Sequence, residues 1–314
     1  MKLVSIPANP APDDVVCGTL KTRDGLLLRF ARWAPPPGRR GTVCIFQGRS
    51  EFIEKYFEVA RDLRARGFAV VAFDWRGQGL SGRMLADPRK GHVRSFDEYE
   101  IDLETVMKEV LLPDCPPPYY GLGHSMGASI LLSVANRHRW FDRIVLSAPM
   151  FDLPPIQWGA LRRPIVQAMR LAGMGSAYIP GGTPAVVAAQ PFVGNNVTTD
   201  PVRHARTAAV IDAEPALGIG SPTVAWAASA FEVMNEFTEP GYATRLRQPT
   251  VMVAAGRDQI VSTSAIEDFS MRMRAGSHLI IAGARHELLM EQDRYRAQFW
   301  AAFDAFVPGA PSFG

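Results

Sequence analysis

Cysteine is scarce in this sequence, and charge of neither sign is concentrated. The three cysteines, Cys17, Cys44 and Cys115, are widely spaced and form no CxxC pair. This pattern argues against a disulfide framework and against a zinc site, and it is typical of reduced thiols. The net charge of +3 arises from lysines and arginines that are scattered along 314 residues. Because the sequence has no basic stripe, we expect no nucleic-acid partner.

Long apolar runs are missing as well. Residues 1–16 lack the apolar core of a signal peptide, and no run of about 18 apolar residues follows them. We therefore expect a cytoplasmic protein that does not cross a membrane. The isoelectric point near 8.8 is compatible with peripheral contact at the inner, anionic face of a membrane. No feature of the sequence indicates the oligomeric state.

The sequence does contain a regular alternation of short apolar runs and amphipathic stretches. "GTVCIFQG" (41–48) and "FAVVAFDWRGQG" (68–79) suit strands that are buried on both faces of a sheet. Between them, residues 51–67 place apolar side chains at helical spacing. The alternation continues through residues 97–149 and resumes at residue 248. Such alternation predicts an α/β fold with a mostly parallel sheet and helices on both faces.

This rhythm stops between residues 151 and 241, a stretch that is rich in Gly, Pro, Ala and Trp. It contains helical pieces and no convincing strand. Because the strand pattern continues on both sides, we interpret the stretch as an insertion within one domain. The predicted organisation is a core made of residues 1–150 and 242–314, with a mainly helical cap at 151–241. A hairpin with Asp24-Gly25 at its turn is predicted before the alternation begins.

Residues 120–129, "YGLGHSMGAS", contain the pattern G-x-S-x-G around Ser125. An apolar run precedes the pattern and an apolar helix follows it, as expected for a nucleophile on a strand-to-helix turn. Such a turn leaves no room for side chains two positions before and after the serine, which fits Gly123 and Gly127. The start of the helix also directs N–H groups toward developing negative charge. The alternative is a glycine-rich loop with a capping serine.

A catalytic serine needs a base, and the base needs an orienting acid. In α/β-hydrolases these groups follow the serine at the ends of later strands, in the order Asp or Glu, then His. Asp258 follows the apolar run in "VMVAAGRDQIV", and His286 follows the next run in "LIIAGARHELLMEQ". Because catalytic groups collect at the carboxyl ends of strands in open α/β sheets, Ser125, Asp258 and His286 are predicted to converge.

Other histidines and carboxylates compete for these roles. His92, in "KGHVRSF", precedes the serine, so we expect it to order a loop beside the site or to contact the substrate. Asp268 falls inside a predicted helix, and Glu287 is interpreted as a supporting or surface group beside the base. Asp74 follows a strand, and we expect it to hold the adjacent turn through Arg76 or nearby backbone N–H groups.

An oxyanion hole requires two N–H donors that point at one position. Met126, directly after the serine, supplies the first donor, and Arg49, in "FQGRSEF", supplies the second. Gln47, Gly48 and His124 adjoin these donors and are predicted substrate contacts. The Arg49 side chain could also meet an anionic group of the substrate, or it could remain an exposed loop arginine.

Five stretches carry a family likeness: "FQGRSEFIEKY", "FDWRGQGLSGRMLADPRKGHVRSFDEYEIDL", "GHSMGA", "GRDQIV" and "ARHELLMEQD". Together they resemble the monoacylglycerol lipase and lysophospholipase group of the α/β-hydrolase superfamily, including bacterial lysophospholipases. The resemblance covers almost the whole chain outside residues 151–241. It implies an α/β-hydrolase fold with a triad of Ser125, Asp258 and His286, and with oxyanion donors at Arg49 and Met126.

The chain departs from many members of this group at Gln47, where they carry histidine before the glycine. Gly48 is kept, so we expect the backbone geometry of the oxyanion loop to be intact. Residues 151–241 would form the cap over the site, and their apolar side chains would line an acyl-binding cleft or pack the cap onto the sheet. The residues singled out for the cleft are Trp158, Trp226 and Met234.

We therefore predict a serine hydrolase that cleaves a carboxylic ester through an acyl-enzyme, with no cofactor and no metal. The predicted substrate is a single-chain lipid, either a lysophospholipid or a monoacylglycerol. A small-ester esterase, a thioesterase or an aminopeptidase-like amidase would use the same residues on a different substrate. A non-catalytic binding protein on the same fold would usually have lost a triad member, and here all three candidates are present.

Overall fold

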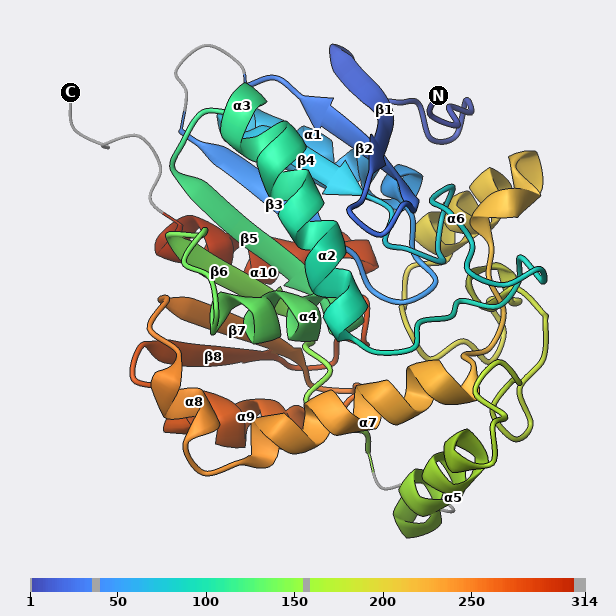
Figure 1. Cartoon of the computed structure of the whole chain (residues 1–314). Helices are drawn as coiled ribbons and strands as arrows, with labels where there is room; N and C mark the ends of the chain where they lie inside the picture. The colour runs from blue at the N-terminus through green and yellow to red at the C-terminus, as the bar shows by residue number, and fades with distance from the viewer. Residues whose placement is uncertain (1, 36–39, 155–158, 308–314) are drawn as a thin grey trace.

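The structure, a computed structural model, describes residues 2–35, 40–154 and 159–307. Within these residues, eight strands form one sheet in the order β1-β2-β4-β3-β5-β6-β7-β8 (Figure 1). β2 runs antiparallel to both β1 and β4, and the other neighbouring strands are parallel. The strands are β1 (Val15–Lys21), β2 (Leu27–Trp33), β3 (Thr42–Phe46), β4 (Ala69–Phe73), β5 (Tyr119–His124), β6 (Arg143–Ser147), β7 (Thr250–Ala255) and β8 (Gly276–Ile281).

The predicted strand–helix alternation is confirmed along both parts of the core. β1 and β2 form the predicted hairpin, and Gly25 in its turn has a φ of +90°, which glycine adopts without strain. The helices are η1 (Ile53–Tyr56), α1 (Phe57–Ala65), α2 (Asp97–Val106), η2 (Met107–Leu111), α3 (Leu112–Asp114), α4 (Ser125–Ala135), α5 (Gly159–Leu171), η3 (Val187–Ala189), α6 (Pro201–Ala213), η4 (Pro215–Leu217), α7 (Val224–Thr238), α8 (Tyr242–Arg245), α9 (Thr263–Arg272), η5 (Leu288–Met290) and α10 (Asp293–Phe306).

The sheet is buried on both faces, which explains why its central strands are almost wholly apolar. In β3, Cys44 and Phe46 belong to one apolar cluster, whereas Val43 and Ile45 belong to another. Helices α2, α4 and α9 cover the first face, and α1 and α10 cover the second (Figure 1). Alternate residues of one strand therefore serve two separate cores.

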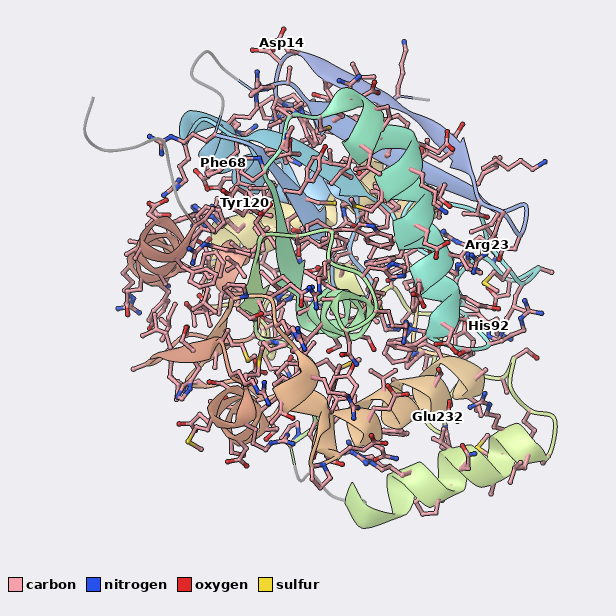
Figure 2. All side chains as sticks on the ribbon, turned by 60° about the vertical axis from the view of Figure 1, so that its left-hand side comes forward. Asp14, Arg23, Phe68, His92, Tyr120 and Glu232 are labelled. Atoms are coloured by element: carbon pink, nitrogen blue, oxygen red, sulfur yellow. The ribbon has the colours of Figure 1, made fainter. Side chains whose placement is uncertain are left out.

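Edge-to-face contacts between aromatic rings reinforce the second core. The rings of Phe68 and Tyr120, which are labelled in Figure 2, have centroids 5.8 Å apart and planes 84° apart. Phe303 of α10 contacts Phe68 in the same way, with centroids 6.0 Å apart. Perpendicular rings at this distance are the favourable arrangement of their quadrupoles. These contacts fix α10 against the amino-terminal ends of β4 and β5.

Between β6 and β7, the described residues contain helices α5 to α8, and their only β pairing is an isolated bridge between Tyr178 and Thr223. α5 packs along α7 (Figure 1). α7 begins at Val224, directly after the N-cap residue Thr223, whose hydroxyl accepts the N–H of Trp226. Trp226 and Met234 of α7 join the same apolar cluster as α4. Among the helices that the structure describes, none is long and apolar enough to cross a membrane.

The turn after β4 is held by a buried ion pair that differs in part from our expectation. Nε of Arg29, on β2, donates to Asp74 at 2.7 Å, and Asp74 also accepts the N–H of Leu80 at 2.7 Å. The expected backbone donors are therefore confirmed. Of the two alternatives that we expected, the contact with Arg76 is the one that does not form, because Arg76 turns toward α2 and donates to Asp102 at 2.8 Å.

Candidate active site

Ser125 lies at the junction of β5 and α4 in a strained backbone conformation. Its φ is +51°, a left-handed value that residues other than glycine rarely adopt. A Cβ atom at Gly123 would lie 2.6 Å from Cα of Ala128, and a Cβ atom at Gly127 would lie closer than 3.0 Å to carbonyl oxygens at the end of β3. Close packing therefore requires both glycines, and the turn between them holds Ser125 at the carboxyl end of β5.

A line of hydrogen bonds runs from Ser125 through His286 to Asp258. Oγ of Ser125 lies 3.0 Å from Nε2 of His286, and Nδ1 of the same ring lies 2.8 Å from Oδ2 of Asp258. Asp258 follows β7 and His286 follows β8, so loops after three different strands meet at one edge of the sheet. All three side chains are buried. The structure thus brings together the three residues that the sequence singled out.

The surroundings of Asp258 define which ring nitrogen of His286 carries a proton. Oδ1 of Asp258 accepts the backbone N–H groups of Ile260 at 2.8 Å and Val261 at 3.0 Å. Burial raises the pKa of Asp258, but the hydrogen bond and charge of His286, with these backbone donors, bring it below its ordinary value. The ionised carboxylate can only accept hydrogen bonds, so Nδ1 is the donor. In the neutral imidazole, Nε2 therefore presents its lone pair to the Ser125 hydroxyl.

A second buried histidine, His124, lies beside His286. The two ring centroids are 4.9 Å apart. Nδ1 of His124 donates to the carbonyl oxygen of Ser147 at 3.1 Å, since a carbonyl oxygen can only accept. Burial lowers the pKa of His124, although Glu51, whose Oε1 lies 3.8 Å from Nε2, opposes this shift. Burial therefore disfavours the charged form of His124 beside His286.

The loop after β3, which carries the expected second oxyanion donor, is fastened by Glu51. Oε2 of Glu51 accepts the N–H of Gly48 at 2.5 Å and the hydroxyl of Tyr56 at 2.7 Å, while Oε1 accepts Nζ of Lys55 at 2.8 Å. Burial raises the pKa of Glu51, but the charge of Lys55, followed by that of His124, lowers it to about 2. An ionised carboxylate therefore holds the backbone immediately before Arg49.

Lys55 also connects this loop to the loop of the histidine. Its Nζ lies 2.7 Å from Oε1 of Glu287, which directly follows His286. Sequence reasoning missed Glu51 and Lys55 altogether. Opposite charges four residues apart, at the start of a stretch with helical spacing, were the available signal. On the other side of the serine, Met126 is the second residue of α4, so its N–H is one of the first-turn donors that have no partner within the helix.

A cavity of about 750 Å³ opens onto Ser125. This volume is typical of sites that bind small molecules. One wall consists of the sheet loops, and the other consists mostly of apolar side chains from residues 151–241. The first wall includes Gly48, Arg49, His124, Ser125, Met126 and His286, and the second includes Ile165, Trp226, Ala227, Phe231 and Met234.

Two predicted substrate contacts, Gln47 and His92, are not among the described residues that line this cavity. Gln47 is fully buried, and its backbone carbonyl oxygen accepts the indole N–H of Trp75 at 2.9 Å. His92 lies near α2 and α7 in Figure 2, and its Nδ1 is 2.9 Å from Oγ1 of Thr223. His92 thus joins the segment that precedes α2 to the start of α7. Trp158 lies outside the described residues.

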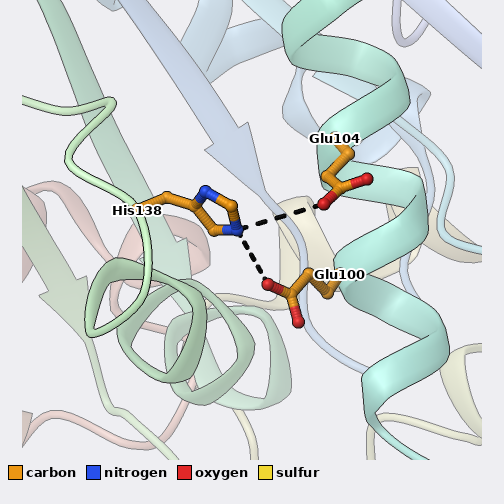
Figure 3. A group of neighbouring side chains, drawn as sticks. All are labelled: Glu100, Glu104 and His138. Carbon is orange, nitrogen blue, oxygen red and sulfur yellow. Dashed lines mark hydrogen bonds and ion pairs between the residues drawn. The ribbon is translucent and has the colours of Figure 1, made fainter.

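Glu100, Glu104 and His138 are grouped closely enough to hold a metal ion. Figure 3 shows Nε2 of His138 facing both carboxylates, 2.9 Å from Oε1 of Glu100 and 4.0 Å from Oε1 of Glu104. Arg137 donates to both oxygens of Glu100, and Arg23 donates to Glu104 at 2.8 Å. The carboxylates are therefore engaged with arginines that link α2 to neighbouring elements, and none of these residues lines the cavity.

The sheet order and the residues at its carboxyl edge define the molecule as an α/β-hydrolase. A soluble variant of monoglyceride lipase from Saccharomyces cerevisiae, in complex with a substrate analog, has a TM-score of 0.74 over 93% of this chain and 96% of that chain, at 18% identity. A carboxyl esterase from Bacillus coagulans has a TM-score of 0.70 over 95% of this chain and 100% of that chain, at 17% identity. At such low identity, these likenesses establish the fold.

The family follows from the sequence itself. The model of the serine aminopeptidase S33 family matches residues 37–293, and the chain belongs to this family. Lysophospholipase L2 of Escherichia coli is 32% identical over 287 residues, which cover 87% of this chain and 82% of that protein. A monoacylglycerol lipase of Mycolicibacterium smegmatis is 32% identical over 127 residues, 40% of this chain and 43% of that protein. These matches confirm the predicted class, a carboxylic ester hydrolase with the α/β-hydrolase fold.

Proposed function

We propose that this protein hydrolyses the carboxylic ester of a single-chain lipid, a lysophospholipid or a monoacylglycerol, through an acyl-enzyme on Ser125. The observation that carries the proposal is the hydrogen-bonded line from Ser125 through His286 to Asp258 at the wall of an apolar cavity. The names of two relatives, a lysophospholipase and a monoacylglycerol lipase, support a lipid ester as the substrate.

The first half of the reaction forms the acyl-enzyme. Oγ of Ser125 attacks the ester carbonyl carbon while its proton passes to Nε2 of His286, which lies 3.0 Å away. Asp258 stabilises the imidazolium that forms, through the bond to Nδ1. The tetrahedral intermediate then collapses, the bond to the alcohol breaks, and His286 returns the proton to the alcohol oxygen. A water molecule activated by His286 cleaves the acyl-enzyme by the same steps.

The negative charge on the carbonyl oxygen needs fixed donors. We assign this role to the backbone N–H groups of Met126 and Arg49, which adjoin Ser125 and Gly48. Both residues line the cavity beside the nucleophile. The first N–H belongs to the start of α4, where the helix dipole also favours negative charge. The second lies in the loop that Glu51 holds through Gly48.

Residues 151–241 act in this proposal as a cap that receives the acyl chain. Ala227, Phe231 and Met234 lie on α7, and their apolar side chains line the cavity. An aminopeptidase-like reaction would need an anionic group to receive a free amino terminus. Among the described residues, the carboxylates that line the cavity are those of Glu51 and Glu287, and both are paired with Lys55. This favours an ester of an apolar acid over a peptide.

We further propose that the protein works at the surface of the membrane that holds its substrate. Ile165, Leu171 and Met174, on and just after α5, expose a large share of their apolar side chains. Arg163 and Arg170 lie on the same helix, and Arg170 is paired with Glu232 of α7. Exposed apolar side chains with arginines between them are typical of a helix that lies on an anionic membrane surface.

Replacement of the nucleophile tests the proposed reaction. Ser125→Ala should lower kcat/KM for a monoacylglycerol by about 10⁴-fold or more, because no acyl-enzyme can form. The matched control is Ser133→Ala on the same helix, whose side chain bonds to Tyr242 and does not line the cavity. A fluorophosphonate probe should label the wild type and Ser133→Ala but not Ser125→Ala. Undiminished turnover or labelling of Ser125→Ala would show that the proposed function is wrong.

A further inference from the structure

The side chain of Arg49 lies between the oxyanion loop and residues 151–241. Its Nη2 donates to the carbonyl oxygen of Gly220 at 2.6 Å, and its Nη1 donates to Oγ of Ser50 at 3.1 Å. Its Cζ lies 5.3 Å from the centroid of the Trp226 ring. Arg49 and Trp226 both line the cavity that opens onto Ser125. Arg49 is therefore a cation inside the proposed binding site and not an exposed loop residue.

Among the described residues, no carboxylate oxygen lies within 4.0 Å of a nitrogen of this cation, so no ion pair forms. Its two described hydrogen bonds go to neutral oxygens, and its buried Nε has no hydrogen-bond partner among the described residues. Burial lowers the pKa of Arg49 to about 10, against the opposing effects of Tyr99 and Tyr178, so the side chain stays charged at neutral pH. A buried cation without a counter-charge is costly unless a ligand supplies one.

The other charged groups of the cavity do not supply it. Glu51 and Glu287 also line the cavity, but Lys55 lies between them at 2.8 Å and 2.7 Å. Both oxygens of Glu51 already accept hydrogen bonds from residues of its own loop and helix. Arg162, on α5, adds a second positive residue to the lining. Among the described residues, the charge beside the oxyanion loop that has no counter-charge is therefore that of Arg49.

We propose that the guanidinium group of Arg49 binds the phosphodiester of a lysophospholipid and thereby selects phosphate-bearing lipids over neutral monoacylglycerols. This inference rests on the proposed function and narrows its substrate class. A guanidinium group and a phosphate match in shape and charge, because two parallel N–H donors meet two oxygens. In a lysophospholipid, only the glycerol unit separates the phosphate from the ester. One residue can therefore contact both groups, with its backbone N–H at the ester and its side chain at the phosphate.

The chemistry of the two half-reactions sharpens this inference. The phosphate belongs to the alcohol that leaves when the acyl-enzyme forms. Arg49 therefore acts on the phosphate only during acylation, and the acyl-enzyme left on Ser125 is the same for a lysophospholipid and a monoacylglycerol with the same acyl chain. The selection should appear in kcat/KM, which reports steps up to acylation, and not in the rate of acyl-enzyme hydrolysis.

The experiment compares two substrates within each variant. A lysophosphatidylglycerol and a monoacylglycerol with the same short acyl chain are used, both below their critical micelle concentrations. The measured quantity is kcat/KM for the lysophosphatidylglycerol divided by kcat/KM for the monoacylglycerol. An effect of the substitution on the oxyanion loop changes both values alike and cancels in this ratio. Arg49→Gln should lower this ratio by about ten- to a hundred-fold, as expected for a charge-assisted hydrogen bond. Arg49→Lys keeps the charge but not the paired donors, so its ratio should lie between those of the wild type and Arg49→Gln.

Two controls make the result decisive. Arg162→Gln removes a second cation from the same cavity and should change the ratio much less. Glycerophosphoglycerol should inhibit hydrolysis of a neutral chromogenic ester by the wild type and inhibit Arg49→Gln less. An unchanged ratio in Arg49→Gln would mean that Arg49 only holds residues 151–241 through Gly220, and it would overturn the inference. If Arg162→Gln lowered the ratio as much as Arg49→Gln does, the inference would also be overturned, because the positive charge of the cavity as a whole would then explain the selection.

The outcomes also separate this inference from the proposed function. If Ser125→Ala still hydrolyses both substrates, the proposed function fails. If Ser125 is required for both substrates but the ratio does not depend on Arg49, only the selection fails. The melting temperature of each variant, measured beforehand, shows whether it is folded. Should Arg49→Gln not fold, Arg49→Lys carries the test, because it retains the charge.

Discussion

The two walls of the cavity differ in how they are held. The wall formed by the sheet loops is polar and cross-linked, and Glu51 alone accepts bonds from Gly48, Tyr56 and Lys55. The wall formed by residues 151–241 is mostly apolar, and α5 ends at Leu171, whose side chain is 81% exposed. Proton transfer requires fixed donors and acceptors, whereas an acyl chain requires only apolar surface of suitable shape. Changes in the first wall should therefore remove turnover, and changes in the second should alter which substrate is used.

The largest effect in the first wall, after loss of the nucleophile, is expected for Asp258→Asn. An amide at this position no longer fixes the proton on Nδ1 of His286, nor does it stabilise the imidazolium. We expect kcat to fall by about 10³- to 10⁴-fold while the melting temperature stays near that of the wild type. Near-normal turnover would point to another acid, and Glu267→Gln and Asp268→Asn would then be the variants to measure.

A smaller effect in the same wall is expected for Glu51→Gln. Its amide cannot accept all three hydrogen bonds, so the loop before Arg49 loosens, and kcat/KM should fall by about 10²-fold. The free energy of unfolding should fall by about 2–3 kcal/mol at pH 7, because Lys55 keeps only Glu287 as a counter-charge. Measurement of Glu51→Gln, Lys55→Met and the double variant gives a double-mutant cycle for the interaction between Glu51 and Lys55. Equal activity of Glu51→Gln and the wild type would contradict the role of Glu51 in holding the loop.

The same carboxylate predicts a pH dependence of stability. The pKa of Glu51 is lowered in the folded state from 4.5 to about 2. A lowered carboxyl pKa contributes stability that is fully present above the unfolded value and is lost as pH falls toward the folded value. Wild-type stability should therefore decline between about pH 4.5 and pH 2 more steeply than that of Glu51→Gln. Chemical denaturation at a series of pH values measures this, and parallel curves would contradict it.

In the second wall, Ala227→Leu should change selectivity more than turnover. Ala227 lies on α7 and lines the cavity, so a larger side chain fills space that we assign to the acyl chain. We expect kcat/KM for a long-chain ester to fall by about tenfold relative to an acetyl ester, as expected for lost apolar contact. Ala227→Val should give an intermediate ratio. Equal losses for both esters would mean that the acyl chain does not pass this side chain.

The smallest effect on turnover is expected for Leu171→Asp, at the exposed end of α5. The substitution should leave hydrolysis of a water-soluble ester unchanged, because Leu171 does not line the cavity. Binding to vesicles that contain anionic lipid should fall by several-fold, as expected when an exposed apolar side chain is replaced by an acid. Flotation of both proteins with vesicles measures this. Equal flotation would argue that α5 does not contact the membrane.

The sequence predicted the first wall far better than the second. The G-x-S-x-G turn, Asp258 and His286 follow strands whose apolar runs are local signals, and parallel strands bring their carboxyl ends to one edge. The bond of Lys55 to Glu287 depends on how two separate loops meet, which no local pattern encodes. His92 illustrates the same limit, because its partner Thr223 lies 131 residues further along the chain. Within residues 151–241, Trp226 and Met234 line the cavity as the sequence suggested, whereas Trp158 lies outside the described residues.

The two ion pairs of Lys55 also affect how the site responds to heating. Because one ammonium group pairs with both Glu51 and Glu287, the loop of the oxyanion donor and the loop of the histidine are joined to the start of the same helical stretch. Neither loop can loosen on warming without separating a buried ion pair, which is expensive inside the protein. Heat inactivation should therefore coincide with global unfolding of the sheet and should not precede it.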